Sequence, residues 1–362
     1  MNPAPKVICL GEALVDRLGP LGGDPATASL DQCDDRLGGA PANVACALAR
    51  LGTPSAFVGR LGQDAIGESF ERLMAGRGVE LAGLQRDATR PSRVVLVRRH
   101  ADGERVFQGF AGDQGQGFSD QALDCSELQA VWPALAAQAQ WLLVGTIPLA
   151  TAASAESLRW AVDQAKGAGV RIALDVNWRP TFWDEHRDPA AGPDSAALSA
   201  MQPLVAAASL LKLAKEEALW LFGTADPSVI SAGLPQTPDV VVTDGGNTVR
   251  WHLAGASGVL EALAPPQVVD TTGAGDAFSS GLLHQLVQGS LPPEQMLRFA
   301  AACGALVCGG AGAIDPQPDA AAVQQFLAAA AHPLVRPSAA AHLLLNEDRD
   351  YCGDNSDRKS VV

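Results

Sequence analysis

The chain has 362 residues, of which 18% are charged and 47% are hydrophobic, a balance typical of a protein with a large buried core. Its formal net charge of −14 argues against a nucleic-acid or anionic-membrane surface, because phosphate groups attract basic patches. The same charge does not exclude a nucleotide substrate, since a nucleotide binds locally through a few N–H groups and a metal.

Cysteine and histidine spacing excludes two further classes of protein. The seven cysteines contain no C-x-x-C pair and the six histidines no H-x-x-x-H pair, so we expect reduced thiols and no zinc site. No signal peptide is visible before Glu12, and the longest weakly polar run, 299–314, is too short to cross a bilayer. The sequence therefore predicts a cytoplasmic protein.

Along the chain, short apolar runs alternate with helical patterns. This alternation predicts an α/β fold with three layers, in which a mostly parallel sheet is flanked by helices. Helices are expected over 41–51 and 64–77, each followed by a glycine. Strands are expected over 7–15, 57–61, 141–146, 171–176, 209–213 and 239–243.

Two segments interrupt the alternation. Residues 92–99 and 105–110 flank an Asp-Gly turn at 101–104, which is a hairpin pattern. We expect a small antiparallel sheet formed by about 14–38 and 90–112, acting as a lid that excludes water, with an ordinary edge hairpin as the alternative. The exposed edges of such a sheet suggest a homodimer.

The domain is expected to span 1–332. Residues 333–362 are polar and lack periodicity, so this tail is expected to be disordered.

The segment V-V-D-T-T-G-A-G-D-A-F at 268–278 is the most informative. An apolar, strand-like run leads into a glycine turn and then an apolar helix, so backbone N–H groups and a helix dipole should converge on an anion. Asp276 lies in the first helical turn, where a carboxylate can act as a base in phosphoryl transfer. A dinucleotide fingerprint fails because Phe278 takes the third glycine position, which disfavours an NAD oxidoreductase, and no Walker motif is present.

Two other polar groups follow predicted strands or precede predicted helices. Gly38 and Gly39 precede a helix whose first turn carries Asn43, which suits either a hydroxyl ligand or a helix cap. Asn177 and Arg179 follow a strand and would share a face if that strand continued. An arginine there suits a phosphate or an acidic sugar, and a plain surface loop is the alternative.

The run D-T-T-G-A-G-D-A-F at 270–278 resembles the C-terminal signature of the PfkB, or ribokinase-like, family of carbohydrate and nucleoside kinases. The run G-G-A-P-A-N-V-A at 38–45 resembles the N-terminal signature of the same family, and the resemblance covers roughly residues 6–330. It implies a ribokinase-like (Rossmann-like) kinase that uses ATP and Mg²⁺. It also implies that Asp276 is the catalytic base and that the backbone of Gly273, Ala274, Gly275 and Asp276 forms the anion hole.

The resemblance also assigns a sugar site. It implies that Asp16, Gly38, Gly39 and Asn43 hold sugar hydroxyls. The opening G-E-A-L-V-D at 11–16 is similar to that of fructokinases, and D-x-N-x-R at 175–179, with Asn177 and Arg179 as substrate contacts, is similar to fructokinases and 2-keto-3-deoxygluconate kinases.

For the nucleotide, the resemblance implies two segments. The run from Lys212 to Glu217 resembles an N-x-x-E element whose glutamate lies near magnesium and the phosphates, although Ala214 replaces its asparagine. Thr243, Gly245 and Gly246 resemble a nucleotide loop, T-x-G-x-x-G, that ends here in Thr248. Asp270 and Thr272 match positions that often line a monovalent-cation site, which suggests K⁺.

The resulting hypothesis is an ATP-dependent fructokinase whose partners are a small sugar and ATP. A 2-keto-3-deoxygluconate kinase, a ribokinase or another PfkB-type kinase are alternatives within the class. A non-catalytic, fructokinase-like interaction protein is the alternative from another class.

Overall fold

The apolar strands build one large sheet whose two faces are both covered. The computed structural model describes residues 3–100 and 105–331. In strand β1 (Val7–Leu10), Ile8 and Leu10 pack into one hydrophobic core cluster, and Val7 and Cys9 pack into another. Successive side chains of a strand point to opposite faces. A run that is apolar throughout is therefore the pattern of a strand buried on both sides.

The other strands of this sheet are β4 (Ser55–Gly62), β5 (Glu80–Asp87), β8 (Trp141–Val144), β9 (Arg171–Asp175), β10 (Leu210–Ala214), β11 (Asp239–Thr243), β12 (Thr248–Leu253) and β13 (Ala256–Glu261). Over the described residues the order is β13-β12-β11-β10-β9-β8-β1-β4-β5. Pairing is parallel from β5 to β11 and antiparallel for β12 and β13. The predicted mostly parallel α/β sheet is confirmed.

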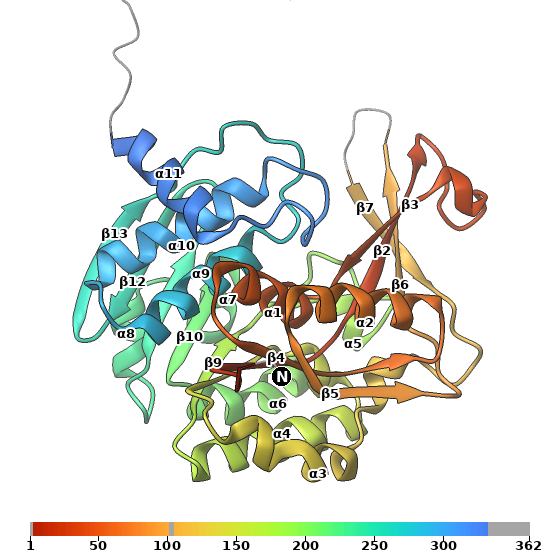
Figure 1. Cartoon of the computed structure of the whole chain (residues 1–362), viewed down its shortest axis with the longest axis horizontal. Helices are drawn as coiled ribbons and strands as arrows, with labels where there is room; N and C mark the ends of the chain where they lie inside the picture. The colour runs from red at the N-terminus through yellow and green to blue at the C-terminus, as the bar shows by residue number, and fades with distance from the viewer. Residues whose placement is uncertain (1–2, 101–104, 332–362) are drawn as a thin grey trace, which may run out of the picture.

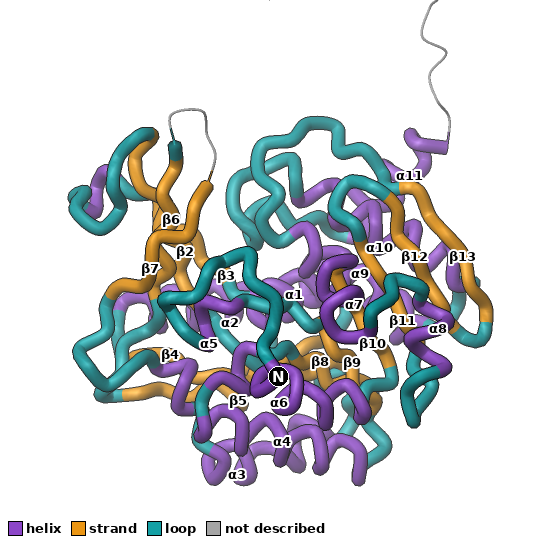
Figure 2. Tube along the Cα trace, turned by 180° about the vertical axis from the view of Figure 1, so that it is seen from behind, coloured by secondary structure: helices purple, strands orange, loops and turns teal. Residues whose placement is uncertain are grey.

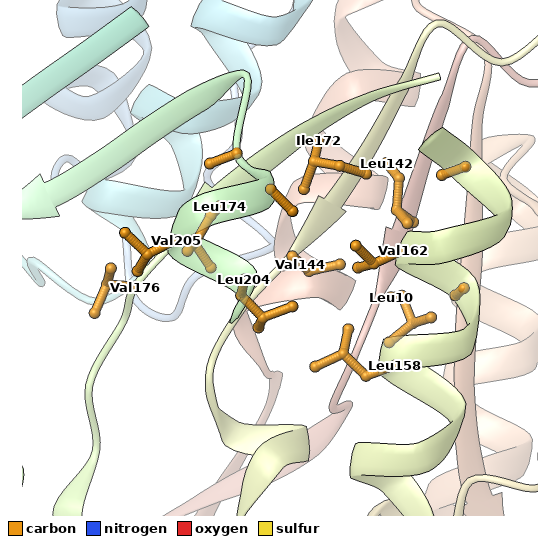
Figure 3. Close-up of a cluster of buried hydrophobic side chains, with 14 of the residues drawn as sticks. Leu10, Leu142, Val144, Leu158, Val162, Ile172, Leu174, Val176, Leu204 and Val205 are labelled. Carbon is orange, nitrogen blue, oxygen red and sulfur yellow. The ribbon is translucent and has the colours of Figure 1, made fainter. Parts of the chain in front are cut away.

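Helices cover the two faces of the sheet, which gives three layers (Figure 1). One face packs against α1 (Ala40–Leu51), α2 (Ala65–Arg77), α9 (Ala274–Gln288) and α10 (Pro293–Val307). The other packs against α3 (Cys125–Ala136), α4 (Ala152–Gly167), α6 (Ser195–Ala207), α7 (Lys215–Phe222) and α8 (Pro227–Ala232). Figure 3 shows Leu158 and Val162 of α4 against Leu10, Leu142 and Val144 of the sheet. The remaining helices are the short α5 (Pro180–Trp183) and α11 (Ala320–Ala331).

A second, smaller sheet rises from the large one, as Figures 1 and 2 show from opposite sides. Its strands are β2 (Leu14–Leu21), β3 (Asp34–Gly38), β6 (Val94–Arg99) and β7 (Arg105–Ala111), in the order β3-β2-β6-β7 within the described chain. The predicted hairpin is present as β6 and β7, and the predicted turn at 101–104 lies outside the described residues. The central pair, β2 and β6, is parallel, so the expectation of a wholly antiparallel sheet was wrong.

The single strand predicted over 7–15 was also wrong, because Gly11 divides it. Gly11 has a φ of +153°, and a Cβ there would lie 2.5 Å from Cγ of Pro41. Only glycine tolerates that conformation and that close approach. The chain therefore leaves the large sheet after β1 and enters the small sheet as β2.

The strand expected before the glycine turn does not form. Val268 and Val269 are 64% and 48% exposed and lie in an irregular connection between β13 and α9. Neither side chain has a sheet neighbour to pack against, so their β-branched character did not determine the structure.

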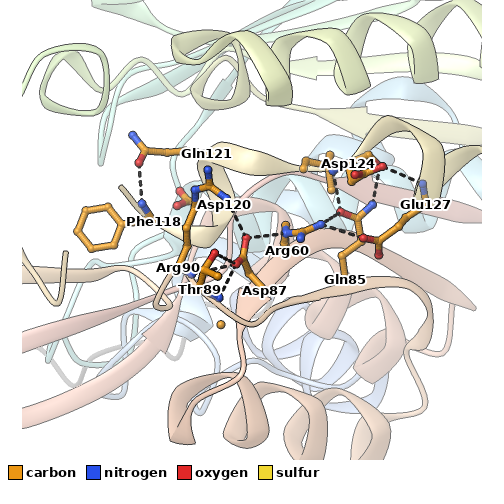
Figure 4. Close-up of polar contacts among 12 residues, drawn as sticks. Arg60, Gln85, Asp87, Thr89, Arg90, Phe118, Asp120, Gln121, Asp124 and Glu127 are labelled. Atoms are coloured by element: carbon orange, nitrogen blue, oxygen red, sulfur yellow. Dashed lines mark hydrogen bonds and ion pairs between the residues drawn. The ribbon is translucent and has the colours of Figure 1, made fainter. Parts of the chain in front are cut away.

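Polar contacts fix the connection from β5 to β6, at the base of the small sheet (Figure 4). The buried Asp87 carboxylate accepts hydrogen bonds from the N–H groups of Thr89 and Arg90 and from Nε of Arg60. Burial alone would raise the pKa of Asp87, but these donors hold it well below its usual value. The small sheet is thus anchored to the large one by a charged group that stays ionised.

No helix of the described chain is long and apolar enough to cross a membrane. The predicted disordered tail, 333–362, lies outside the described residues.

Candidate active site

A cavity of about 530 Å³ lies between the carboxyl ends of the parallel strands and the small sheet. Glu12 follows β1, Arg179 follows β9 and Lys212 lies in β10, while Asp16, Val95 and Phe107 reach the cavity from the small sheet. This edge of a parallel sheet is where α/β folds hold ligands, and the volume suits a small molecule. The small sheet therefore forms one wall of the cavity, and its role as a lid stays a prediction.

The turn from Asp270 to Asp276 forms one wall of this cavity. Gly273 caps α9 with a φ of +77°, and a Cβ there would lie 2.5 Å from Cβ of Ala313, so only glycine fits. Asp270 holds the turn: Oδ1 accepts from the N–H and Oγ1 of Thr272, at 3.0 and 2.7 Å, and Oδ2 accepts from Gly312 N at 2.8 Å. Because the first N–H groups of a helix have no partner within it, this wall suits an anion.

Asp276 lies in the first turn of α9 and faces the cavity. Burial raises the pKa of its carboxyl to about 6, and the nearby Asp175 adds to that rise, while Asn43, Lys212 and Arg179 oppose it. A carboxylate with a pKa in this range is suited to accepting a proton near neutral pH.

Asn43, from the first turn of α1, is joined to Asp276 across 233 residues of sequence. Its Nδ2 donates to Oδ2 of Asp276 at 2.7 Å. Its Oδ1 is buried and has no hydrogen-bond partner among the described residues. Because buried polar atoms are rarely left unpaired, this oxygen is placed to accept a hydrogen bond from a ligand hydroxyl.

Lys212 lies beneath the glycine turn. Its Nζ is 3.0 Å from Oδ1 of Asp175, whose Oδ2 accepts from Oγ of Ser279 at 2.8 Å. A Cβ on Gly275 would lie 3.2 Å from that nitrogen. Burial alone would lower the pKa of Lys212, but the surrounding carboxylates keep it above its usual value, so the ammonium stays charged.

Glu217 is buried in the first turn of α7. One oxygen accepts from Trp178 N and the other from Ala214 N, both at 2.7 Å. Burial raises the pKa of its carboxyl, and the Lys212 charge works against that rise. The residue that departs from the expected asparagine, Ala214, thus contributes its backbone N–H. Glu217 ties the ends of β9 and β10 together.

The structure brings most of the predicted site residues to one cavity. Those that line it are Asp16, Gly39, Asn43, Asn177, Arg179, Lys212, Glu217, Asp270, Thr272, Gly273, Gly275 and Asp276. The strand does not continue to Asn177 and Arg179, because β9 ends at Asp175 and Asn177 has a φ of +43°. Both side chains reach the cavity from a loop.

Five predicted residues do not line the cavity. Gly38 packs under Asp16, with a Cβ position 3.1 Å from Oδ2 of that residue, and Ala274 packs against Gly304 of α10. The loop carrying Thr243, Gly245 and Gly246 joins β11 to β12 outside the cavity, beside the Lys215–Asp244 ion pair.

Two charged residues that line the cavity were missed by sequence reasoning. Glu12 is 3% exposed, accepts from Ala40 N at 3.0 Å, and has its pKa raised by burial to about 8. Arg36 enters from β3, where it pairs across the sheet with Asp16. The available signals were weak. Glu12 lies two residues after the end of β1, and Arg36 is two residues before Gly38 and so shares its face of β3.

A glycine turn at a helix start, a carboxyl whose pKa is raised to about 6 and a pocket lined by polar groups suit an enzyme that transfers a charged group. Similarity to a known protein family identifies the class of enzyme. The chain belongs to the pfkB family of carbohydrate kinases, whose model matches residues 4–320. It is therefore a sugar kinase, a phosphotransferase.

Relatives and solved structures agree with this assignment. The chain is 33% identical over 324 residues to a fructokinase of Klebsiella pneumoniae, covering 86% of this chain and 96% of the relative. It is 33% identical to the probable chloroplastic fructokinase-6 of Arabidopsis thaliana, covering 90% and 83%.

Among structures, the fructokinase of Xylella fastidiosa with bound ATP superposes with a TM-score of 0.75 at 29% identity, covering 90% of this chain and 99% of that one. The fructokinase of Vibrio cholerae with fructose, ADP and calcium gives a TM-score of 0.72 at 29% identity, covering 89% and 99%.

Proposed function

We propose that this sugar kinase is an ATP-dependent fructokinase that converts ATP and D-fructose to ADP and fructose 6-phosphate. The proposal depends mainly on the contact between Asp276 and Asn43 beside the glycine turn. That contact brings the Asp276 carboxylate and the unpartnered Oδ1 of Asn43 together beside the glycine turn, in one cavity, which supports a base and a hydroxyl acceptor next to an anion site. The fructokinases of Klebsiella, Arabidopsis and Xylella support the choice of sugar and nucleotide.

In the proposed reaction, Asp276 takes the proton of the primary sugar hydroxyl as its oxygen attacks the γ-phosphorus of ATP. A bond forms from that oxygen to phosphorus, and the bond from phosphorus to the bridging oxygen of ADP breaks. The amides of Gly273, Gly275 and Asp276 stabilise the charge that spreads over the transferred group. The fourth amide of the expected anion hole, that of Ala274, donates to the carbonyl of Thr271 at 3.2 Å. Asn43 and Asp16 orient the sugar, while the small sheet keeps out water that would otherwise take the phosphate.

The residues present fit Mg²⁺ only as an indirectly held ion. Both oxygens of Glu217 already accept backbone N–H groups, so this carboxylate would act on Mg²⁺ through water. When bound, Mg²⁺ neutralises phosphate charge. A K⁺ site beside Asp270 and Thr272 stays a prediction, since both carboxylate oxygens of Asp270 accept hydrogen bonds from N–H or O–H donors.

A second candidate substrate is an acidic sugar such as 2-keto-3-deoxygluconate. Arg179 is exposed, lines the cavity, and donates to the carbonyl of Trp178 at 2.9 Å. Its guanidinium therefore keeps donors available for a carboxylate.

A side-by-side assay of fructose, ribose, adenosine and 2-keto-3-deoxygluconate with MgATP tests the proposal. We expect fructose to give the highest kcat/KM. Preference for another acceptor would replace the substrate but keep the kinase chemistry. If no acceptor is turned over by folded protein, the non-catalytic interaction protein becomes the better description.

A further inference from the structure

Arg36 occupies a position that the proposed reaction does not explain. It lies on β3 of the small sheet, on the face that Asp16 shares, because the two residues are directly paired across β2 and β3. It also lines the cavity together with the glycine turn. Its side chain therefore bridges the sugar side of the pocket and the anion side.

The stem of Arg36 lies against the loop that supports the anion turn. A Cβ on Gly312 would lie 3.3 Å from Cδ of Arg36. Gly312 donates its N–H to Asp270, and the next residue, Ala313, packs directly on Gly273. One layer of backbone thus separates the arginine stem from the turn that is to hold the phosphate.

The guanidinium of Arg36 is paired with carboxylates that an anionic ligand could replace. Nη2 is 2.8 Å from Asp34 and Nη1 is 3.3 Å from Asp315, whose side chains are 42% and 71% exposed. Ion pairs with exposed carboxylates contribute little. The Nε atom is buried without a hydrogen-bond partner among the described residues, so it lacks the acceptor that a phosphate oxygen would supply.

The charge of the cavity also favours an additional cation at the phosphate. Lys212 is already paired with Asp175, and Arg179, which follows β9, acts on the charge of Asp276. Acidic groups outnumber basic groups among the described residues of the lining, the acidic ones being Glu12, Asp16, Glu217, Asp270 and Asp276. A nucleotide phosphate entering this field needs a donor beside the amides.

We propose that Arg36 contacts the terminal phosphate of the nucleotide, exchanging Asp34 and Asp315 for phosphoryl oxygens and adding a charged donor to the amide turn. Arginine suits this role because its planar fork matches phosphate geometry. The inference extends the proposed kinase function: it makes a strand of the small sheet part of the phosphate site, so that closure and phosphate binding occur together.

The test compares Arg36→Gln and Arg36→Lys with the parent, with Arg72→Gln as the matched control. Arg72 is an exposed arginine on α2 that is 3.7 Å from Glu68. Binding of the unreactive analogue AMP-PNP and of ADP is measured by calorimetry, and kcat and both KM values are measured with the best sugar of the panel. Thermal melting verifies that each variant is folded.

Losing Arg36 should lower kcat by about 10²-fold, the size seen when one transition-state donor is removed. The preference for AMP-PNP over ADP should fall by about tenfold, which corresponds to one charged hydrogen bond, while the sugar KM stays nearly constant. The lysine variant should recover part of both losses. Arg72→Gln should change neither.

Unchanged AMP-PNP preference in folded Arg36→Gln would overturn the proposal. So would a loss confined to the KM of an acidic sugar, which would assign Arg36 to the substrate carboxylate instead. The two binding measurements need no turnover. They therefore decide the role of Arg36 even if the sugar panel defeats the fructokinase proposal.

Discussion

Replacing Asp276 with asparagine should separate catalysis from stability. The substitution keeps the shape of the side chain and an acceptor oxygen for Nδ2 of Asn43, but it removes the base. General-base catalysis contributes about 10²–10⁴-fold, so kcat should fall by at least about 10²-fold with little change in either KM. The parent should also lose kcat/KM below a pH of about 6, the pKa of Asp276, and the variant should lack that acidic limb.

The same substitution should stabilise the fold at neutral pH. Folding raises the pKa of Asp276 from 3.8 to about 6, so the folded state binds the proton more tightly than the unfolded state. The charged carboxylate therefore destabilises the folded state. This destabilisation is absent below pH 3.8, grows between pH 3.8 and pH 6, and is constant above that. Each pKa unit corresponds to about 1.4 kcal/mol. After allowance for solvent screening of this partly exposed side chain, the expected destabilisation is about 1–3 kcal/mol.

The assay is urea unfolding at pH 4 and pH 8 beside steady-state kinetics, with Asp163→Asn, an exposed aspartate of α4, as control. The variant should be more stable than the parent at pH 8 and nearly equal to it at pH 4. Turnover within about tenfold of the parent, in folded protein, would refute Asp276 as the base. A stability gain of the same size at both pH values would refute the buried-charge argument.

Three further predictions concern the groups around this base. Asn43→Ala removes a donor that lowers the pKa of Asp276, so the acidic limb of kcat/KM should move to higher pH and the sugar KM should rise; an unmoved limb would exclude this coupling. Glu12→Gln should melt higher than the parent by an amount that grows from pH 5 to pH 8, because burial raises the pKa of Glu12 to about 8 and the parent loses stability over that window; a difference independent of pH would contradict this. Replacing K⁺ with choline should slow the parent several-fold and affect Asp270→Asn less, and equal rates of the parent in both salts would remove the cation site.

The chemistry could be predicted from the sequence because it resides in short contiguous runs. In the segment from Asp270 to Asp276, the glycines, the hydrogen-bonded aspartate and the first helical turn are neighbours in the chain. Local backbone preferences therefore specify both the anion wall and the position of the base. The same reasoning pointed to Gly39 and Asn43 at the start of α1, and both line the cavity. It failed for Val268 and Val269, because an apolar pair alone does not form a strand without a neighbouring strand and a face to cover.

What the sequence alone determined was therefore the class of fold, the two glycine turns and the identity of the proposed base, all of which depend on residues adjacent in the chain. Only the tertiary structure decided which distant groups meet: Asn43 with Asp276 across 233 positions, and Arg36 with Asp315 across 279. It also decided that Glu12 is buried and that Arg36 lines the cavity. Burial and partner distance set pKa values and charge contacts, and neither quantity exists until separate strands and helices pack around one cavity.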